Sequence, residues 1–272
     1  MLLKIAGISK STFHYTKNHL EYKAKKDEPL LKEIQKIYIE NNGKYGYPRI
    51  TLELQRRGYK VNKKRVARIM QENNIRATKK KRRYNSYKGT IGKIAPNILE
   101  RDFKTTGPYQ KLGTDVTVFI TPHGKLYLSP VIDFHTREIL AYDISEHPNM
   151  QQIRRMLDRL VKNHGQYLDG AIMHSDQGWQ YQMLYYRKFL KEHNIIQSMS
   201  RKGNCLDNSP TENFFGRLKT EMYYDREYSF KSLAELRSNI HSYIRYYNQE
   251  RLVLKTKVGP QECREKHLEA VI

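Results

Sequence analysis

The spacing of hydrophobic residues predicts helices in the first third of the chain. At the start of the segment 28–77, apolar side chains recur at intervals of three and four residues, at Leu30, Leu31, Ile34, Ile37 and Tyr38. This is the spacing of one face of a helix. Residues 49–57 predict a second helix, with Pro48 near its start and Gly58 at its end. Asn62 can cap a third helix, so we expect three short helices in this segment.

From residue 109 the pattern changes to that of strands. Three runs rich in β-branched and aromatic residues follow one another through short connections, at 112–120, 125–134 and 137–144. Short connections favour antiparallel pairing. Further strands are expected at 170–175 and 195–199, and further helices at about 150–163, 181–193, 210–223 and 231–248. Three strands followed by alternating helices and strands predict an α/β fold with a mixed five-stranded sheet and flanking helices.

The charge of the chain is distributed unevenly between these two parts. The 272 residues include 50 Lys and Arg against 28 Asp and Glu, a formal charge of +22. Residues 1–88 hold 24 basic and 7 acidic residues, a net charge of +17. This excess is more than solubility requires and indicates a polyanionic partner, most simply a nucleic acid. We therefore expect the first third to anchor the chain electrostatically.

The basic residues of the first third fall on two segments. The third predicted helix has an apolar inner face and a basic outer face, as a helix that enters a major groove requires; the alternative is a helical bundle with a solvated basic face. Residues 76–83 carry six positive charges, either as an arm along phosphates or as a solvated spacer. We predict DNA contacts from Lys63, Lys64, Arg65, Arg68, Lys79, Lys80, Lys81, Arg82 and Arg83.

These patterns divide the chain into three regions. Residues 1–77 are predicted as a helical, helix-turn-helix-like DNA-binding module, residues 78–108 as a basic linker, and residues 109–272 as a catalytic core with C-terminal helices. Two interpretations of residues 1–27 stay open. Residues 7–15 resemble the turn and start of a recognition helix whose first part precedes Met1 in another reading frame, and a frayed terminal helix fits equally well.

Several classes of protein are excluded or disfavoured by composition. The two cysteines, Cys205 and Cys263, do not form a CxxC pair, so a zinc site built on paired thiolates is not expected. No apolar run approaches the ~20 residues that span a bilayer, and the N-terminus does not fit a signal peptide. Nucleophile-elbow and P-loop motifs are absent. We expect a cytoplasmic protein that has no membrane partner.

Three acidic residues are the strongest candidates for chemistry. Asp115 lies in the first strand-like run, Asp176 ends the fourth, and Glu212 opens a predicted helix with 35 residues between it and Asp176. Carboxylates from strand ends and a helix can converge on a pair of divalent metals. Such a pair activates a nucleophile and stabilises the leaving oxygen at a phosphodiester, which matches the basic surroundings.

Each of these carboxylates also has a structural alternative. Asp115 can be a strand aspartate paired with an arginine, and Asp133 competes with it as a strand-end carboxylate. Asp176 can be a turn aspartate before Gly178. Glu212 fits a capping box in which Ser209 is the N-cap and the glutamate occupies the third helical position. The following turns favour function, because a small residue, Gly216, and a cation, Lys219, share the face of Glu212. We expect Lys219 to point along a bound DNA backbone.

The motifs around these residues resemble a known family. They include ThrAspValThr (114–117), HisSerAspGlnGlyTrpGlnTyr (174–181), residues 200–219 with SerProThrGluAsnPhePheGlyArgLeuLys, and TyrIleArgTyrTyrAsnGlnGluArg (243–251). Over about residues 30–262 the chain resembles the DDE transposases of bacterial insertion sequences, in particular the downstream-frame (OrfB) products of the IS-three family. Leu112 and Gly113 stand where many relatives have an aromatic residue, and ProGlnGluCys (260–263) replaces a Pro-x-x-aromatic pattern.

The resemblance implies a fold, an activity and a set of partners. The fold is a ribonuclease-H-like integrase core with a basic helical module in place of the zinc-binding domain of retroviral integrases. Two Mg²⁺ or Mn²⁺ ions would be held by Asp115, Asp176 and Glu212 for DNA strand cleavage and strand transfer. The partners would be double-stranded DNA, both terminal inverted repeats and target DNA, a second copy of the chain on that DNA, and an upstream-frame product by fusion or association.

Two other functions stay open at this point. A transposase-derived regulator would bind DNA without catalysis, and intact carboxylates argue against it. A ribonuclease-H-like nuclease would hydrolyse without joining, and the basic N-terminal module argues against that because it suits recognition of particular ends.

Overall fold

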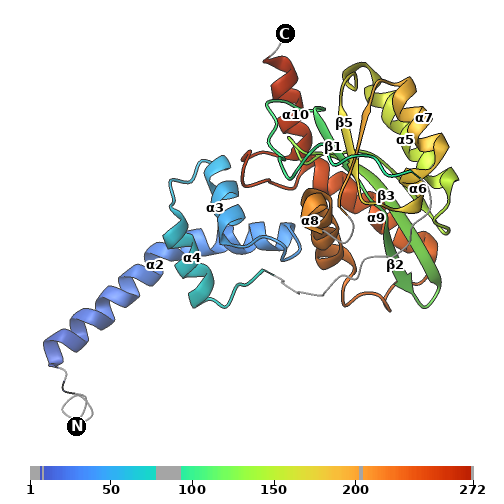
Figure 1. Ribbon diagram of the computed structural model, residues 1–272. Coiled ribbons are helices and arrows are strands. Elements are labelled where there is room, and N and C mark those ends of the chain that lie inside the picture. The colour runs from blue at the N-terminus through green and yellow to red at the C-terminus, as the bar shows by residue number, and fades with distance from the viewer. Residues whose placement is uncertain (1–6, 8, 78–92, 202–204, 271–272) are drawn as a thin grey trace. The chain divides into compact units, whose positions relative to one another are not determined.

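The computed structural model describes residues 7, 9–77, 93–201 and 205–270, and the chain divides into two compact units, residues 1–79 and 80–272 (Figure 1). Each unit is described by itself. Among the helices that the structure describes, none has the length and apolar character needed to cross a membrane.

Within its described residues, the first unit contains three helices, α2 (Lys10–Glu40), α3 (Tyr47–Arg56) and α4 (Lys63–Glu72). The second and third match the predicted helices closely. Asn62 caps α4 by accepting a hydrogen bond from the Arg65 amide, and Gly58 follows α3 with a left-handed φ of 87°, the conformation that ends a helix most easily at glycine. The first helix differs from the prediction because it runs on from Lys10, so residues 10–27 are its first half.

The helices of the first unit are held together by an apolar interior and one buried carboxylate. Their fully buried residues face one another, and include Ile34, Ile37, Ile50, Leu54, Val66 and Ile69. At the side of this interior, Asp27 of α2 receives hydrogen bonds from Arg65, at 2.9 Å, and Arg68, both in α4. These bonds tie two of the predicted DNA-contacting residues to the fold of their own module.

The second unit is built on a mixed sheet. Its strands are β1 (Lys111–Thr114), β2 (Thr117–Thr121), β3 (Gly124–Asp133), β4 (Ile139–Ser145), β5 (Ile172–Ser175) and β6 (Ile196–Met199). The β3 strand pairs antiparallel with β1, β2 and β4, whereas β1, β5 and β6 are parallel neighbours. Strand β1 and strand β2 lie in line along the same edge of β3, so the sheet has the five predicted positions.

The first predicted strand, 112–120, is interrupted at Asp115. Thr114 pairs with Val131 and Thr117 pairs with Leu128, so the register is continuous and sets Asp115 opposite Pro130. Proline has no N–H group to donate to the neighbouring strand. The Val116 amide instead donates to Asp115 Oδ1 at 2.7 Å. The backbone hydrogen bonds with β3 are therefore interrupted at Asp115, and its carboxylate lies at the end of a strand.

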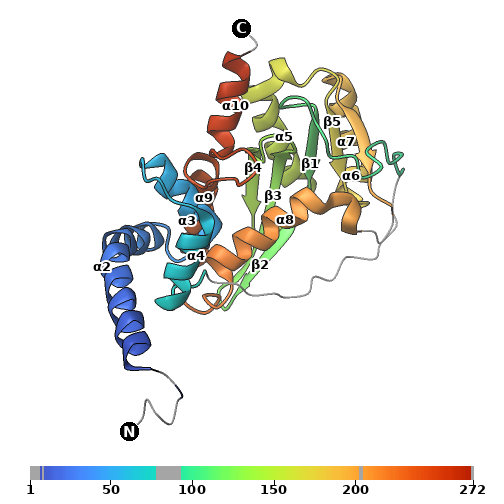
Figure 2. The same ribbon diagram turned by 90° about the vertical axis from the view of Figure 1, so that its left-hand side faces the viewer.

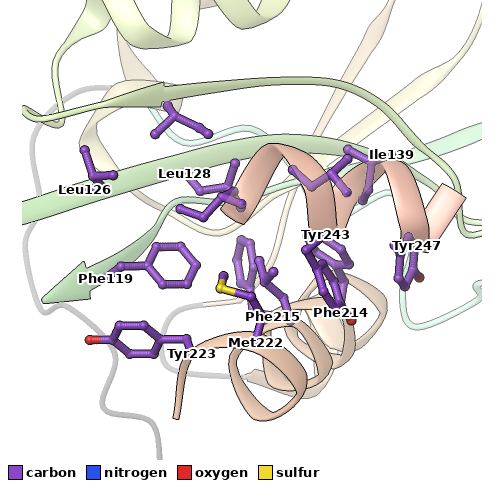
Figure 3. Packing of buried hydrophobic residues seen from close by; sticks show 14 of the residues in the cluster. Phe119, Leu126, Leu128, Ile139, Phe214, Phe215, Met222, Tyr223, Tyr243 and Tyr247 are labelled. Carbon is purple, nitrogen blue, oxygen red and sulfur yellow. The ribbon is translucent and has the colours of Figure 1, made fainter. Parts of the chain in front are cut away.

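Helices cover both faces of the sheet (Figures 1 and 2). Helices α5 (Met150–His164) and α7 (Leu184–Glu192) pack on one face with the short α6 (Trp179–Gln182). Helices α8 (Ser209–Leu218) and α9 (Leu233–Gln249) pack on the other. Figure 3 shows the second interface, where Phe215 and Met222 lie toward Phe119 of the sheet and Phe214 lies beside Tyr243 of α9.

Three further elements differ from the predicted pattern. The predicted helix 210–223 is α8 followed by a π-helical turn, Lys219–Tyr223. Helix α10 (Pro260–Glu269) had no counterpart in the predicted elements. Part of the predicted linker 78–108 packs on the second unit: Leu99 is buried in the hydrophobic cluster of Phe214 and Phe215, and the Ile98 amide donates to Ser198 Oγ of β6.

Candidate active site

Asp115 and Asp176 follow neighbouring parallel strands in matching register. Lys111 pairs with Ile172 and Gly113 pairs with His174, so continuing the register by two residues sets Asp115 beside Asp176. Both residues stand at the carboxyl ends of their strands, where ligand-binding groups gather in sheets of this kind. Each has one fixed carboxylate oxygen, because Asp115 Oδ1 accepts from the Val116 amide at 2.7 Å and Asp176 Oδ1 accepts from the Gly178 amide at 2.8 Å.

Glu212 is brought to the same edge by close packing of α8 on β1. A Cβ at Gly113 would lie 2.5 Å from Thr211 Oγ1 and 2.4 Å from the Phe134 ring, which is closer than any real contact. Only glycine therefore lets α8 approach the strand that precedes Asp115. The neighbour of Thr211 in the helix is Glu212, so this approach sets how near its carboxylate stands to the two aspartates.

The predicted capping box at the start of α8 is wrong. Ser209 is the first helical residue, Asn208 occupies the N-cap position, and the cap lacks a side-chain hydrogen bond. A 3-10 turn, Cys205–Asn208, runs directly into α8 and displaces the expected cap by one residue. Glu212 is then too far into the helix for the reciprocal bond of a capping box, and its structural alternative is removed.

The three carboxylates influence one another electrostatically. Burial raises the pKa of Asp115 well above its usual value, and the charges of Asp176 and Glu212 raise it further, against the Val116 amide and Lys219, which lower it. Burial also raises the pKa of Asp176, opposed by the Gly178 amide. Burial and then the charge of Asp176 raise the pKa of Glu212. The site thus concentrates negative charge that a cation would relieve.

Lys219 is the cation of the chain that acts on Asp115. It stands seven residues after Glu212, and its ammonium lies 5.5 Å from the centre of the Phe119 ring in β2. Burial lowers the pKa of Lys219, and the charge of Asp115 raises it. Gly216, between Glu212 and Lys219, has open space where a Cβ would stand. Glu212 and Lys219 both act on the charge of Asp115, although Lys219 lies in the π-helical turn that follows α8.

Asp133, the competing candidate, is occupied in a turn. Its carboxylate is fully buried and accepts from the Tyr109 amide at 3.0 Å and from the amide and hydroxyl of Thr136, both at 2.8 Å. These hydrogen bonds account for an aspartate at the end of the strand, the position that made Asp133 a candidate ligand. It plays a structural part at the end of β3.

The three carboxylates do not form a closed group of metal ligands in the structure. Within the described residues, no group of three or more His, Cys, Asp or Glu side chains is gathered closely enough to hold one. The residues nevertheless fit divalent metal ions, because Mg²⁺ and Mn²⁺ favour carboxylate oxygens and the three carboxylates share a half-buried, negatively charged edge.

Comparison with known proteins accounts for nearly the whole chain. Family models match at residues 25–83 (HTH-like domain), 105–205 (integrase core domain) and 212–268 (integrase core domain). The putative transposase InsK of insertion sequence element IS150 from Escherichia coli is 48% identical over 94% of this chain and 89% of its own. Transposase InsF of IS3A from the same organism is 34% identical over 76% and 71%.

The chain belongs to the IS3-family transposases of insertion sequences. Among solved structures, a chain of the simian T-cell lymphotropic virus intasome, in complex with PP2A regulatory subunit B56 gamma, has a TM-score of 0.50. That chain is 12% identical and is covered over 74% of its length, with 85% of the transposase covered. At this identity the likeness shows the fold alone, and it confirms the predicted integrase-type, ribonuclease-H-like core.

The basic residues predicted to contact DNA fall into three groups in the transposase. Lys63 and Lys64 are exposed at the start of α4. Arg65 and Arg68 are partly buried and donate hydrogen bonds to Asp27. Hydrophobic periodicity could not predict these bonds, because Asp27 lies 38 residues or more away in the sequence. The remaining group, Lys79, Lys80, Lys81, Arg82 and Arg83, lies outside the described residues.

Sequence reasoning missed a second acidic residue near the start of α8. Asp207 is not among the predicted site residues, yet its carboxylate is fully buried and accepts five hydrogen bonds from Asn97, Arg101 and Arg201. Its spacing from Glu212 is the only signal in the sequence. The partners at 97 and 101 lie in the segment that was predicted as linker.

Proposed function

We propose that the transposase cleaves and joins DNA strands with two Mg²⁺ or Mn²⁺ ions held by Asp115, Asp176 and Glu212. The observation that carries the proposal is the matched register of β1 and β5, which sets two of these carboxylates side by side. The approach of α8 at Gly113 supports the third. When bound, the ions would activate the attacking oxygen and stabilise the leaving oxygen at the phosphodiester.

The protein groups around the carboxylates have separate tasks in this proposal. The amides of Val116 and Gly178 each fix one oxygen of an aspartate, so that the other oxygen can be presented to a metal. Lys219, beside Asp115, supplies a fixed positive charge for a phosphate of the bound strand. The exposed edge next to Gly216 leaves room for the DNA backbone.

The reaction needs no covalent bond between protein and DNA. In cleavage, water attacks the phosphorus, the bond from phosphorus to O3′ breaks, and a 3′-hydroxyl and a 5′-phosphate result. In strand transfer, that 3′-hydroxyl attacks a phosphodiester of another strand and releases a new 3′-hydroxyl there. Each step exchanges one phosphodiester oxygen for another, so no nucleophilic serine or tyrosine is required.

We further propose how the DNA is held. The helix-turn-helix-like module would recognise the terminal inverted repeats, with Lys63, Lys64 and the basic run 76–83 on phosphates. Bringing two ends together calls for at least two copies of the chain on DNA. Fusion to, or association with, an upstream-frame product remains part of the proposal, as does action at the nucleoid.

One experiment tests the proposed activity. The protein is incubated with Mg²⁺ and a labelled DNA duplex that carries the element's own ends, and the products are resolved by length. Nicking at the ends followed by joined products is the expected result. Nicking without joining would favour the nuclease, and binding without either product would favour the non-catalytic regulator.

A further inference from the structure

We infer that Asp207 is a positioning residue: with Arg101, Arg201 and Asn97 it forms a latch that sets the start of α8 and so the place of Glu212. The inference rests on the proposed metal-binding role of Glu212. The latch joins a segment outside the three carboxylate motifs, residues 97–101, to the turn that leads into α8.

The bonds of the latch come from two separate parts of the chain. Arg101 Nε donates to Asp207 Oδ1 at 2.8 Å, and Asn97 Nδ2 donates to Oδ2 at 3.2 Å. From the other side, Arg201 donates through its amide at 3.1 Å, through Nε at 3.0 Å and through Nη2 at 3.1 Å. Hydrogen bonds to an ionised partner are the strong class, and the hydrogen bonds from Arg201 hold the pKa of Asp207 far below its usual value.

Burial of Asp207 makes the latch specific. Its carboxylate has no exposed surface, while the side chains of Arg101 and Arg201 are 43% and 60% exposed. A buried charge without its partners is costly, so the aspartate must stay where both guanidiniums reach it. The arginines therefore fix the position of Asp207, five residues before Glu212.

The segment that carries Arg101 has an unusual backbone. Glu100 and Arg101 have φ angles of 46° and 67°, a left-handed conformation that residues other than glycine rarely adopt. Two such residues in succession persist only when the surroundings hold them. Leu99 is buried in the cluster that includes Phe214 and Phe215 of α8, and Arg101 binds Asp207, so the segment is anchored toward α8 on both an apolar and a polar side.

The start of α8 has no side-chain cap, a feature that it shares with α3, α7 and α10 among the described helices. In the described part of the chain, α2, α4, α5 and α9 each begin with a side chain that accepts a hydrogen bond from the backbone. Helix α8 has none at Asn208. The residue that is held firmly at this end is Asp207, next to the N-cap.

The latch also reaches the loop of Asp176. Strand β6 pairs with β5 in register, Ser175 with Met199, so Ser200 and Arg201 follow at the same edge as Asp176. Gln177, which follows Asp176, donates from Nε2 to the Ser200 carbonyl at 3.0 Å. Hydrogen bonds of Gln177 with Ser200 and of Arg201 with Asp207 thus connect the loop that follows Asp176 to the turn before α8.

The test compares two aspartates of similar surroundings. Asp207→Asn removes the charge of the latch. Asp143→Asn is the matched control, since Asp143 of β4 is also buried and bound to two arginines, Arg155 and Arg159, but lies on the opposite edge of the sheet. Both variants are expected to lower the melting temperature, because each leaves buried hydrogen bonds weakened.

Mn²⁺ binding to the full chain without DNA separates the two variants. We expect Asp207→Asn to weaken Mn²⁺ binding about tenfold or more, as when a group that orients a metal ligand is removed, and Asp143→Asn to bind Mn²⁺ as the wild type does. Wild-type affinity in a folded Asp207→Asn variant, or equal weakening in both variants, would overturn the latch.

A second variant covers failure of the first to fold. Arg101→Ala leaves the bonds between Asp207 and Arg201 intact and changes a half-exposed residue. Arg101→Ala is expected to weaken Mn²⁺ binding less than Asp207→Asn does. Arg101→Lys is expected to recover part of that loss. Unchanged Mn²⁺ binding in Arg101→Ala would overturn the inference. If the wild type itself binds no Mn²⁺, the proposed function fails with it, whereas a defect confined to Asp143→Asn overturns the latch alone.

Discussion

The backbone of Gly113 in β1 and the side chain of Thr211 in α8 are packed so closely that a Cβ at position 113 would stand 2.5 Å from Thr211 Oγ1. The strand leads to Asp115 two residues later, and the helix carries Glu212 as its next residue. The distance between two of the proposed metal ligands is therefore set by the absence of a side chain at Gly113.

Gly113→Ala is expected to push α8 away from β1. Overpacking of this kind costs about 1–3 kcal/mol of unfolding free energy, and displacement of Glu212 by about 1 Å is expected to slow cleavage roughly 100-fold. The measurements are thermal unfolding and the rate of strand cleavage with Mg²⁺. Gly216→Ala is the control for stability, since its Cβ meets open space and helix interiors favour alanine by about 0.5–1 kcal/mol. Equal stability changes in the two variants would contradict the packing argument.

Glu212→Gln is expected to give a folded, DNA-binding transposase without cleavage activity. The helix does not depend on this carboxylate for a cap, and glutamine keeps its size, so melting temperature and DNA affinity should stay close to wild type. The cleavage rate should fall by roughly 10³-fold, about 4 kcal/mol in activation free energy. Wild-type cleavage by this variant would remove Glu212 from the mechanism.

The contribution of the three carboxylates to the stability of the metal-free protein should decrease as the pH rises. Asp115, Asp176 and Glu212 each have a raised pKa in the folded chain, so the folded state holds their protons more tightly than the unfolded state. Their contribution is fully present below the unfolded pKa, about 4, and is lost as the pH passes through the raised folded values.

Asp115→Asn should reduce this loss. With a chelator present, the variant is expected to melt at a higher temperature than the wild type at neutral pH, because one of three repelling charges is gone. Mn²⁺ should stabilise the wild type but not the variant. Asp158→Asn, an exposed change on α5, should follow the wild type in both respects. A lower melting temperature for Asp115→Asn in chelator at neutral pH would show that repulsion is not the controlling interaction.

Loss of Lys63 and Lys64 should affect DNA binding, whereas loss of Arg65 or Arg68 should affect the stability of the first unit. Replacing both lysines with alanine is expected to weaken DNA binding and to reduce the slope of log affinity against log salt by about 0.9 for each lost phosphate contact, with unfolding unchanged. Replacing either arginine should destabilise the first unit by about 1–2 kcal/mol, since it breaks a partly buried ion pair with Asp27. The salt dependence of binding and thermal unfolding separate the two effects. An unchanged slope in the lysine variant would assign that face to solvent.

The sequence was most informative where local chemistry decides structure. Asn62 caps α4 and Gly58 ends α3 because those signals act within a few residues. The five sheet positions followed from runs rich in β-branched and aromatic residues and from the short connections between them. The interruption at Asp115 was missed because its cause, Pro130, lies on the neighbouring strand, so pairing had to be known first.

The site shows the same limit. Asp176 could be expected at the end of a strand, but the strand end before Asp115 and the closeness of α8 could not. Gly113 and Thr211, which set that closeness, are 98 residues apart. The contacts of the Asp207 latch with residues 97 and 101, and the bonds of Arg65 and Arg68 to Asp27, also join residues that are far apart in the sequence. Local patterns therefore could not predict them. At Ser209, local signals predicted a cap that the preceding 3-10 turn displaces.

The central claim is that Asp115, Asp176 and Glu212 share divalent metal ions. The most direct measurement is anomalous diffraction from crystals of the transposase soaked in Mn²⁺. The account predicts manganese peaks at the carboxyl ends of β1 and β5, in contact with all three carboxylates, and their loss in Glu212→Gln or Asp115→Asn. Manganese bound elsewhere, or peaks that leave one of the three carboxylates without contact, would contradict it.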